Sequence, residues 1–149
     1  MESIIQSYLD ILNMLHEECK EQIYGLGVEQ LDWKPGEDIN SLAVLAAHIA
    51  GAEKHWITEA ILGETSERDR PAEFATQGVG VDTLVGALDD ALDFVRKGLS
   101  TLSIDDLARN VTSPRDGSEI SIALALGHVL QHTALHLGNM QINRQLVMR

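Results

Sequence analysis

Apolar residues recur at steps of three and four along most of the chain, which is the period of an α-helix. Three prolines, at positions 35, 71 and 114, fall between these periodic stretches. The pattern predicts helices over residues 3–26, 41–62, 83–100 and 121–147. Four helices of this length joined by medium-length loops favour an all-α four-helix bundle. The chain has no repeat and no long linker, so residues 1–149 are expected to form one domain.

Capping residues set the expected ends of these helices. Asn40 or Ser41 can cap the second helix and Asp82 the third, and residues 103–106 are similar to a capping box that starts one short turn. Polar segments at 27–40, 64–80 and 112–118 are expected to be loops, with 64–80 an ordered surface loop. The stripe of the first helix that is expected to face the core consists of Ile4, Tyr8, Ile11, Leu12, Leu15, Cys19, Ile23 and Leu26.

The composition agrees with a helical protein and excludes one class of partner. Hydrophobic residues make up 44% of the chain but aromatic residues only 4%, which suits helices better than a β-sandwich. The formal net charge is −12, from 11 Lys and Arg against 23 Asp and Glu, and no basic stripe offsets it. Such a chain would repel a phosphate backbone, so we expect no nucleic-acid partner.

Location follows from the absence of targeting signals and from the cysteine count. No apolar run approaches the roughly 20 residues that a bilayer-spanning helix needs, so no membrane association is expected. The first residues do not resemble a secretory signal, which favours a cytoplasmic protein. Cys19 is the single cysteine, so an internal disulfide and a cysteine-based zinc site are both excluded. Its place on the stripe of the first helix predicts that it packs in the core.

The histidines carry the strongest chemical signal. Six histidines occur, at positions 16, 48, 55, 128, 132 and 136, and the last three are spaced by four residues on one predicted helix. Random placement would give such a triple with an expectation of about 0.005, so chance explains it poorly. Two imidazoles four residues apart on a helix can reach one metal ion, with Zn–N bonds of about 2.0–2.1 Å.

A third ligand has to come from another helix, and the second helix offers His48 and His55. They are two turns apart, about 10 Å along the axis, so one ion can take only one of them. His48 lies in the middle of an apolar stripe, whereas His55 follows Glu53 and Lys54. The segment also holds small residues that let another helix approach: Ala46, Ala47, Ala50, Gly51 and Ala52, with Gly138 on the last helix. We therefore predict a metal site made of His48, His132 and His136.

Other residues near this site have weaker assignments. His16 and His55 are expected to be surface histidines or hydrogen-bonded core histidines. His128 is a partner of the ligands, a proton carrier, or an alternative ligand paired with His132. Trp56 is expected in the core or in a pocket wall beside the site.

Several segments together resemble the DinB-like superfamily, which also contains YfiT-type metal-dependent hydrolases and thiol-dependent S-transferases. The segments that carry the resemblance are residues 31–35 (LDWKP), 41–53 (SLAVLAAHIAGAE), 102–107 (LSIDDL) and 128–138 (HVLQHTALHLG). The resemblance covers nearly the whole chain and implies a four-helix bundle of the DinB/YfiT type. It also implies the metal ligands His48, His132 and His136, and it makes a homodimer the expected assembly.

The sequence departs from the superfamily at one motif. A frequent H-R-G-Q ending stands here as His136-Leu137-Gly138-Asn139, so leucine replaces arginine and asparagine replaces glutamine. The three histidines are unaffected by this change. A contact of Asn139 with the ligand sphere or the substrate pocket is expected to differ from that of relatives.

Three functions remain open from the sequence. The first is a metal-dependent transferase that uses a low-molecular-weight thiol and a small electrophile, or a hydrolase, with water or the thiol completing the shell of a zinc or nickel ion. No residue is identified as a dedicated general base. The second is a non-catalytic metal-binding or small-ligand-binding protein of a stress response, whose site a carboxylate from the first helix would close. The third is a metal-free interaction bundle.

Overall fold

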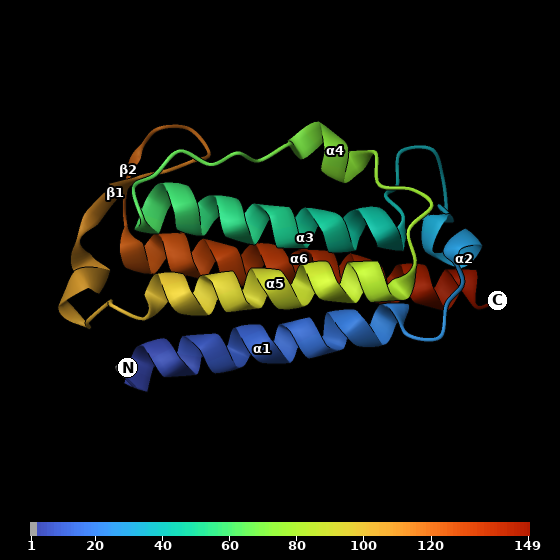
Figure 1. The fold of residues 1–149 in the computed structure, drawn as a ribbon, viewed down its shortest axis with the longest axis horizontal. Helices are drawn as coiled ribbons and strands as arrows, with labels where there is room; N and C mark the ends of the chain where they lie inside the picture. The colour runs from blue at the N-terminus through green and yellow to red at the C-terminus, as the bar shows by residue number, and fades with distance from the viewer. Residues whose placement is uncertain (1–2) are drawn as a thin grey trace.

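The computed structural model describes residues 3–149 and contains four long helices that lie side by side (Figure 1). They are α1 (Ser3–Ile23), α3 (Leu42–Trp56), α5 (Val81–Leu99) and α6 (Ile122–Val147). Both α1 and α3 pack along α5 and α6, so α1 and α3 lie diagonally opposite each other. The predicted all-α four-helix bundle is confirmed.

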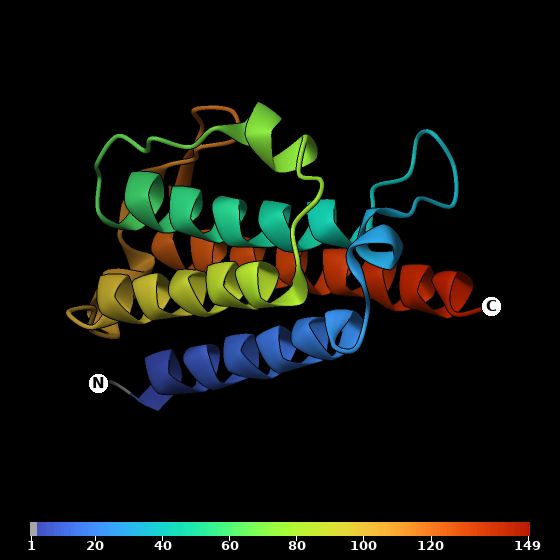
Figure 2. The same ribbon diagram turned by 45° about the vertical axis from the view of Figure 1, so that its right-hand side comes forward.

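Short elements occupy the connections that were expected to be loops. Residues 27–40 contain α2 (Val28–Asp32), and residues 64–80 contain α4 (Arg70–Phe74), which lies over α3 (Figure 2). The segment 64–80 was expected to be an ordered surface loop, and the helix α4 within it was not predicted. A 3₁₀ turn, η2 (Asp105–Ala108), leads to a hairpin of β1 (Asn110–Thr112) and β2 (Glu119–Ser121) with Val111 opposite Ile120. Strands of three residues are too short to give a period of two in the sequence.

Two of the predicted caps are present and one is not. Ser41 accepts a hydrogen bond from the backbone N–H of Val44 at 3.1 Å, and Asp106 accepts one from the N–H of Ser103 at 2.8 Å. Asp82 was wrong as an N-cap, because α5 begins at Val81, two residues earlier than predicted, with Gly80 in the capping position. Asp82 instead lies in the first turn, where its carboxylate interacts favourably with the positive end of the helix dipole.

The helices α3 and α1 end for different local reasons. The α-helical geometry of α3 ends at Trp56, and the chain continues as one π turn, η1 (Ile57–Ile61), before Gly63 with φ +66°. The total extent agrees with the predicted helix over 41–62. The first helix ends at Ile23 rather than residue 26, because Gly25 has φ +79° and cannot continue a right-handed helix.

The buried face of α1 overlaps only in part with the predicted stripe. Its buried residues are Ile5, Leu9, Leu12, His16, Cys19, Lys20 and Ile23. Ile4 and Ile11, which were expected to face the core, are 50% and 48% exposed. The two sets share Leu12, Cys19 and Ile23, so the predicted face was rotated about the helix axis relative to the face that packs against α5 and α6. Cys19 is buried as expected, and burial with the nearby Glu53 and Glu18 raises the pKa of its thiol to about 12.

The helix α6 is apolar on nearly all sides. Its inner side packs against α1 and α3, while Leu124, Leu135 and Ile142 are 58%, 56% and 59% exposed on the opposite side. These three residues and Leu146 define what we call the outer face of α6. Within residues 3–149, no helix has both the length and the apolar character that crossing a bilayer requires.

Candidate metal centre

Three of the six histidines converge between α3 and α6, on the side of the bundle covered by α4. His48 comes from α3, and His132 and His136 come from successive turns of α6. One ring atom from each of the three lies within 4.8 Å of the others. Nε2 of His48 is 3.0 Å from Nε2 of His132, and the rings of His132 and His136 have centroids 4.5 Å apart. The structure thus brings together the three residues that the sequence selected.

Glu73 of α4 fixes the orientation of His48. Nδ1 of His48 lies 3.0 Å from Oε1 of Glu73, and because a carboxylate only accepts hydrogen bonds, Nδ1 carries the proton. Nη2 of Arg68 also approaches Nδ1, but at 3.4 Å, and that contact would need a lone pair on the same nitrogen. We assign the proton by the shorter contact. His48 therefore presents the lone pair of Nε2 towards α6, as a metal-bound histidine with a carboxylate partner does.

Arg68 holds Glu73 in this position. Its Nε and Nη2 donate to the two carboxylate oxygens of Glu73, each at 2.8 Å. A bidentate contact of this kind restricts both side chains and is stronger than a single hydrogen bond. Gly51 makes the approach of α4 possible, because a Cβ at that position would overlap the Glu73 carboxylate. The expectation that Gly138 serves a similar purpose was wrong, since a Cβ there would meet open space.

The three imidazoles are neutral at pH 7. Burial lowers the pKa of His132 to about 3, helped by the charges of the neighbouring histidines, and lowers that of His136 to about 4, helped by His48. Burial also lowers the pKa of His48, an effect that Glu73 partly offsets. A metal ion competes with protons for these nitrogens, so lone pairs that remain free at pH 7 favour metal binding.

The arrangement fits a divalent ion in tetrahedral geometry. Two nitrogens bound at about 2.0–2.1 Å with a tetrahedral angle between them are about 3.3–3.4 Å apart. The observed Nε2–Nε2 distance of 3.0 Å and the 4.8 Å limit for the whole group bracket this separation. Nδ1 of His136 is buried and has no hydrogen-bond partner among residues 3–149, so an additional group is needed to satisfy this ring. Within the same residues, the group contains no fourth histidine, cysteine, aspartate or glutamate.

A pocket of about 740 Å³ opens onto the three histidines. Its walls include Trp56, which stacks on His128 with centroids 4.1 Å apart, and Phe74, whose ring lies 4.9 Å from that of His48. Burial lowers the pKa of His128, and the positive charge of Arg115 lowers it further. A volume of this size accommodates a small organic molecule next to the histidines.

A buried network behind the pocket links three helices. Glu53 of α3 is 1% exposed, and both of its oxygens lie within 2.9 Å of Nε2 of His16 on α1. Oγ1 of Thr133 on α6 donates to Oε1 of Glu53 at 2.7 Å. Because Thr133 follows His132 directly, this bond fixes the height of α6 relative to α3 at the level of the histidines.

The remaining candidates fall into two groups. His128, Trp56 and His55 line the pocket, although none of them belongs to the three-histidine group. His16 is a hydrogen-bonded core residue, as expected. Asn139 is exposed and lines a separate groove with Pro35, Ile142 and Asn143, so the structure does not bring it to the histidines. A contact of Asn139 with the ligand sphere or the substrate pocket stays a prediction that this geometry does not support.

Sequence reasoning missed Glu73, Arg68 and Glu53. Asp69 accepts a hydrogen bond from the N–H of Ala72, and Pro71 lies in the first turn of α4. An N-cap aspartate with proline two residues later is a helix-start signal that could have revealed α4. Nothing comparable marks Glu53, whose exposed neighbour Lys54 suggests a surface position.

Replacing Glu73 by glutamine is expected to lower the affinity for a divalent metal about 10- to 100-fold, the usual loss when a carboxylate partner of a ligating histidine is removed. The amide keeps the shape but loses the charge that orients His48 and pairs with Arg68. Competition with a zinc chelator measures the change. Glu67→Gln, an exposed position in the preceding loop, is the matched control. An affinity equal to that of the wild type in Glu73→Gln would contradict this role.

The metal-free protein is expected to lose stability as the pH falls below about 6.5. His132 and His136 titrate near 6.5 when unfolded and at about 3 and 4 when folded, so the unfolded chain binds more protons in between. The free energy of unfolding therefore rises with pH over this interval. Urea denaturation of metal-free protein at pH 7 and pH 5 measures the difference, and His132→Gln should reduce it. An equal change in the free energy of unfolding between pH 7 and pH 5 in both proteins would contradict a lowered pKa of His132 in the folded state.

The fold and the three-histidine group define the class of the protein, a four-helix bundle with a candidate metal centre between two of its helices. The chain belongs to the family described as mycothiol S-transferase, whose sequence profile matches residues 8–148. Among curated proteins, none matches the chain.

Solved structures with the same fold have distant sequences. A conserved protein from Enterococcus faecalis is similar with a TM-score of 0.81 and 16% identity, covering 99% of both chains. YfiT from Bacillus subtilis, described as a probable metal-dependent hydrolase with an unusual four-helix bundle topology, has a TM-score of 0.77 and 14% identity, covering 97% of this chain and 89% of its own. A mycothiol-dependent maleylpyruvate isomerase has a TM-score of 0.68 and 16% identity, covering 91% of this chain and 60% of its own. At these identities the similarity establishes the fold.

Proposed function

We propose that the protein is a divalent-metal-dependent transferase that joins a low-molecular-weight thiol to a small electrophile. The observation that carries this proposal is the group of three neutral imidazoles at the wall of a pocket, without a carboxylate among the grouped ligand atoms. His48, His132 and His136 would hold the ion and leave a coordination position free. A zinc or nickel ion in such a site would supply a thiolate or an activated water at neutral pH.

The thiol has to come from outside the chain. Cys19 is fully buried, and its thiol has a pKa raised to about 12, so it is neither accessible nor ionised at pH 7. Mycothiol is the thiol that the family name supports. We propose a cytoplasmic location, since a low-molecular-weight thiol and a single unpaired cysteine both suit a reducing compartment.

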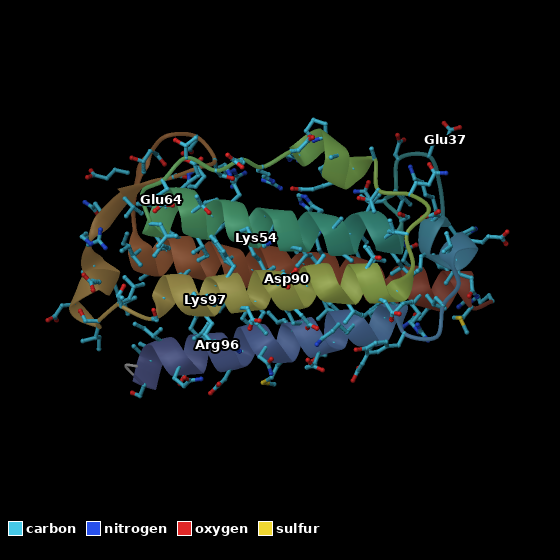
Figure 3. The ribbon with its side chains drawn as sticks, viewed as in Figure 1. Glu37, Lys54, Glu64, Asp90, Arg96 and Lys97 are labelled. Atoms are coloured by element: carbon cyan, nitrogen blue, oxygen red, sulfur yellow. The ribbon has the colours of Figure 1, made fainter. Side chains whose placement is uncertain are left out.

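The experiment that tests the proposed function measures conjugation of mycothiol to 1-chloro-2,4-dinitrobenzene. It compares metal-loaded, metal-stripped and reloaded protein. Activity should disappear on stripping, return on reloading with zinc or nickel, and be absent in His48→Ala. Lys54→Ala, a surface change on the same helix (Figure 3), should retain it. Equal rates with and without metal would contradict the proposal.

Two alternatives give different results when the same protein preparations are tested with a second substrate. A hydrolase would cleave p-nitrophenyl acetate in a metal-dependent manner without added thiol. A non-catalytic metal-binding protein of a stress response would hold one ion per chain and show neither rate. The absence of a fourth ligand in the three-histidine group favours the enzyme, because a purely structural site is normally closed by the protein.

A homodimer is the proposed assembly, and the outer face of α6 supports it. Leu124, Leu135 and Ile142 fall within about 20° of one another around the helix, at 100° per residue, and each is more than half exposed. Apolar side chains aligned in this way favour burial against a second helix. Ile142→Glu is expected to convert a dimer, of twice 16.3 kDa, into a monomer of 16.3 kDa in light scattering. Ile142→Leu should leave the dimer intact, and a dimeric Ile142→Glu variant would exclude this face.

A further inference from the structure

The pocket beside the three histidines has a charge opposite to that of the protein. The chain carries 23 acidic and 11 basic residues, yet Arg68, Arg70 and Arg115 all line this pocket. Among residues 3–149, no aspartate or glutamate lines it. A positive pocket in a chain of net charge −12 is not what random placement of side chains would give.

Two of the three arginines form no ion pair within residues 3–149, although the charge of Arg115 also acts on the neighbouring Asp116. The charge of Arg68 is balanced by the bidentate contact with Glu73. Arg70 lies over the ring of Phe74, 4.7 Å from its centroid, and in the part of the chain that the structure describes neither Arg70 nor Arg115 forms an ion pair. Both side chains are exposed at the mouth of the pocket, so a ligand can reach them.

These two charges come from different elements on the same side of the α3–α6 pair. Arg70 begins α4, and Arg115 lies in the turn between β1 and β2; Figures 1 and 2 both show α4 and this turn above α3, and both arginines line the same pocket. The ring of Phe74 contacts both Arg70 and His48, which puts the Arg70 charge one aromatic ring away from the histidines. A small molecule held at the mouth therefore reaches the histidine group with its other end.

The charge balance of the site calls for an anion. Glu73 and Arg68 cancel each other, and three neutral imidazoles do not reduce the charge of a divalent ion. The positive charges of Arg70 and Arg115 then add to it. Guanidinium groups bind carboxylates in a bidentate manner, which gives this attraction a preferred geometry. The acidic surface repels large polyanions, so a small organic acid is the ligand class that this arrangement favours.

We propose that Arg70 and Arg115 bind the carboxylate of an anionic electrophilic substrate, with its apolar part against Trp56 and Phe74. The proposal rests on the transferase function only in calling the bound anion a substrate. Binding of the anion by the two arginines does not depend on a metal. It places a specificity determinant outside the three-histidine group.

The test uses metal-free protein, so that a carboxylate cannot bind the metal directly. Benzoate and its neutral counterpart benzamide are titrated into the protein, and binding is followed by the fluorescence of Trp56. The protein carries Trp33→Phe, so that Trp56 is its one tryptophan. Benzoate should bind at least 10-fold more tightly than benzamide, and added salt should weaken it. The double variant Arg70→Gln/Arg115→Gln should lose at least 10-fold in benzoate affinity. Arg96→Gln, which removes the same charge on α5 away from α4 (Figure 3), should not.

Equal binding of benzamide, or unchanged benzoate affinity in the double variant, would overturn the proposal, as would an equal loss in Arg96→Gln. In the metal-loaded enzyme, benzoate should compete with the electrophile; competition with the thiol instead would overturn the assignment to the electrophile. Failure of the transferase function would appear separately, as an absence of metal-dependent conjugation with benzoate binding intact.

Discussion

Replacement of His132 by alanine is expected to abolish stoichiometric binding of a divalent transition metal. His132 has ring contacts with both of the other histidines of the group, so its loss leaves two nitrogens without a common third partner. At a free metal concentration 100 times the dissociation constant, bound metal stabilises the wild type by about 2.7 kcal/mol, and the variant should show none of this gain. Thermal unfolding with and without added zinc measures the difference.

His55→Ala provides the matched control for this result. His55 lines the same pocket but lies outside the three-histidine group, so the variant should keep the stabilisation by zinc. Metal-free His132→Ala should unfold near the temperature of the metal-free wild type, since His132 is only partly buried. Full stabilisation of His132→Ala by zinc would show that the ion binds elsewhere.

Glu53→Ala is expected to be the most destabilising single change outside the core hydrophobic residues. It leaves Nε2 of His16 and the hydroxyl of Thr133 buried without their partner. Two unsatisfied buried groups cost about 3 kcal/mol together, which corresponds to a fall in melting temperature of about 6–12 °C for a chain of this size. The variant no longer has the cost of burying a carboxylate. This gain does not offset the loss, because removing one member of a buried pair leaves the other buried without a partner.

Calorimetry of metal-free protein isolates this contribution. Lys54→Ala, one residue further along α3 and exposed, should change the free energy of unfolding by less than about 0.5 kcal/mol. A loss below about 1 kcal/mol in Glu53→Ala would mean that water or another group replaces the carboxylate.

The sequence predicted the long helices well because their apolar period is visible without tertiary information. The residues that the structure adds belong to short elements. The five residues of α4 carry too little period to be recognised, although Asp69 and Pro71 mark its start. Glu73 was missed for this reason, and with it the partner that orients His48.

The proximity of the three histidines could be predicted from the sequence, whereas their surroundings could not, and the reason is geometric. Spacing of four residues on α6 sets the separation of His132 and His136 before any tertiary contact forms. The buried position of Glu53 depends on which helix faces it, and sequence periodicity does not encode the partner. The groove that Asn139 lines could not be predicted for a similar reason, because closeness to His136 in sequence does not say which side of α6 a residue occupies.

The most direct test of the three-histidine centre is a crystal structure of protein purified without a histidine tag and loaded with zinc. Anomalous scattering at the zinc edge should give one strong peak per chain, about 2.0–2.1 Å from a ring nitrogen of each of His48, His132 and His136. A map with no peak between these residues, in protein that holds zinc elsewhere or not at all, would contradict the account.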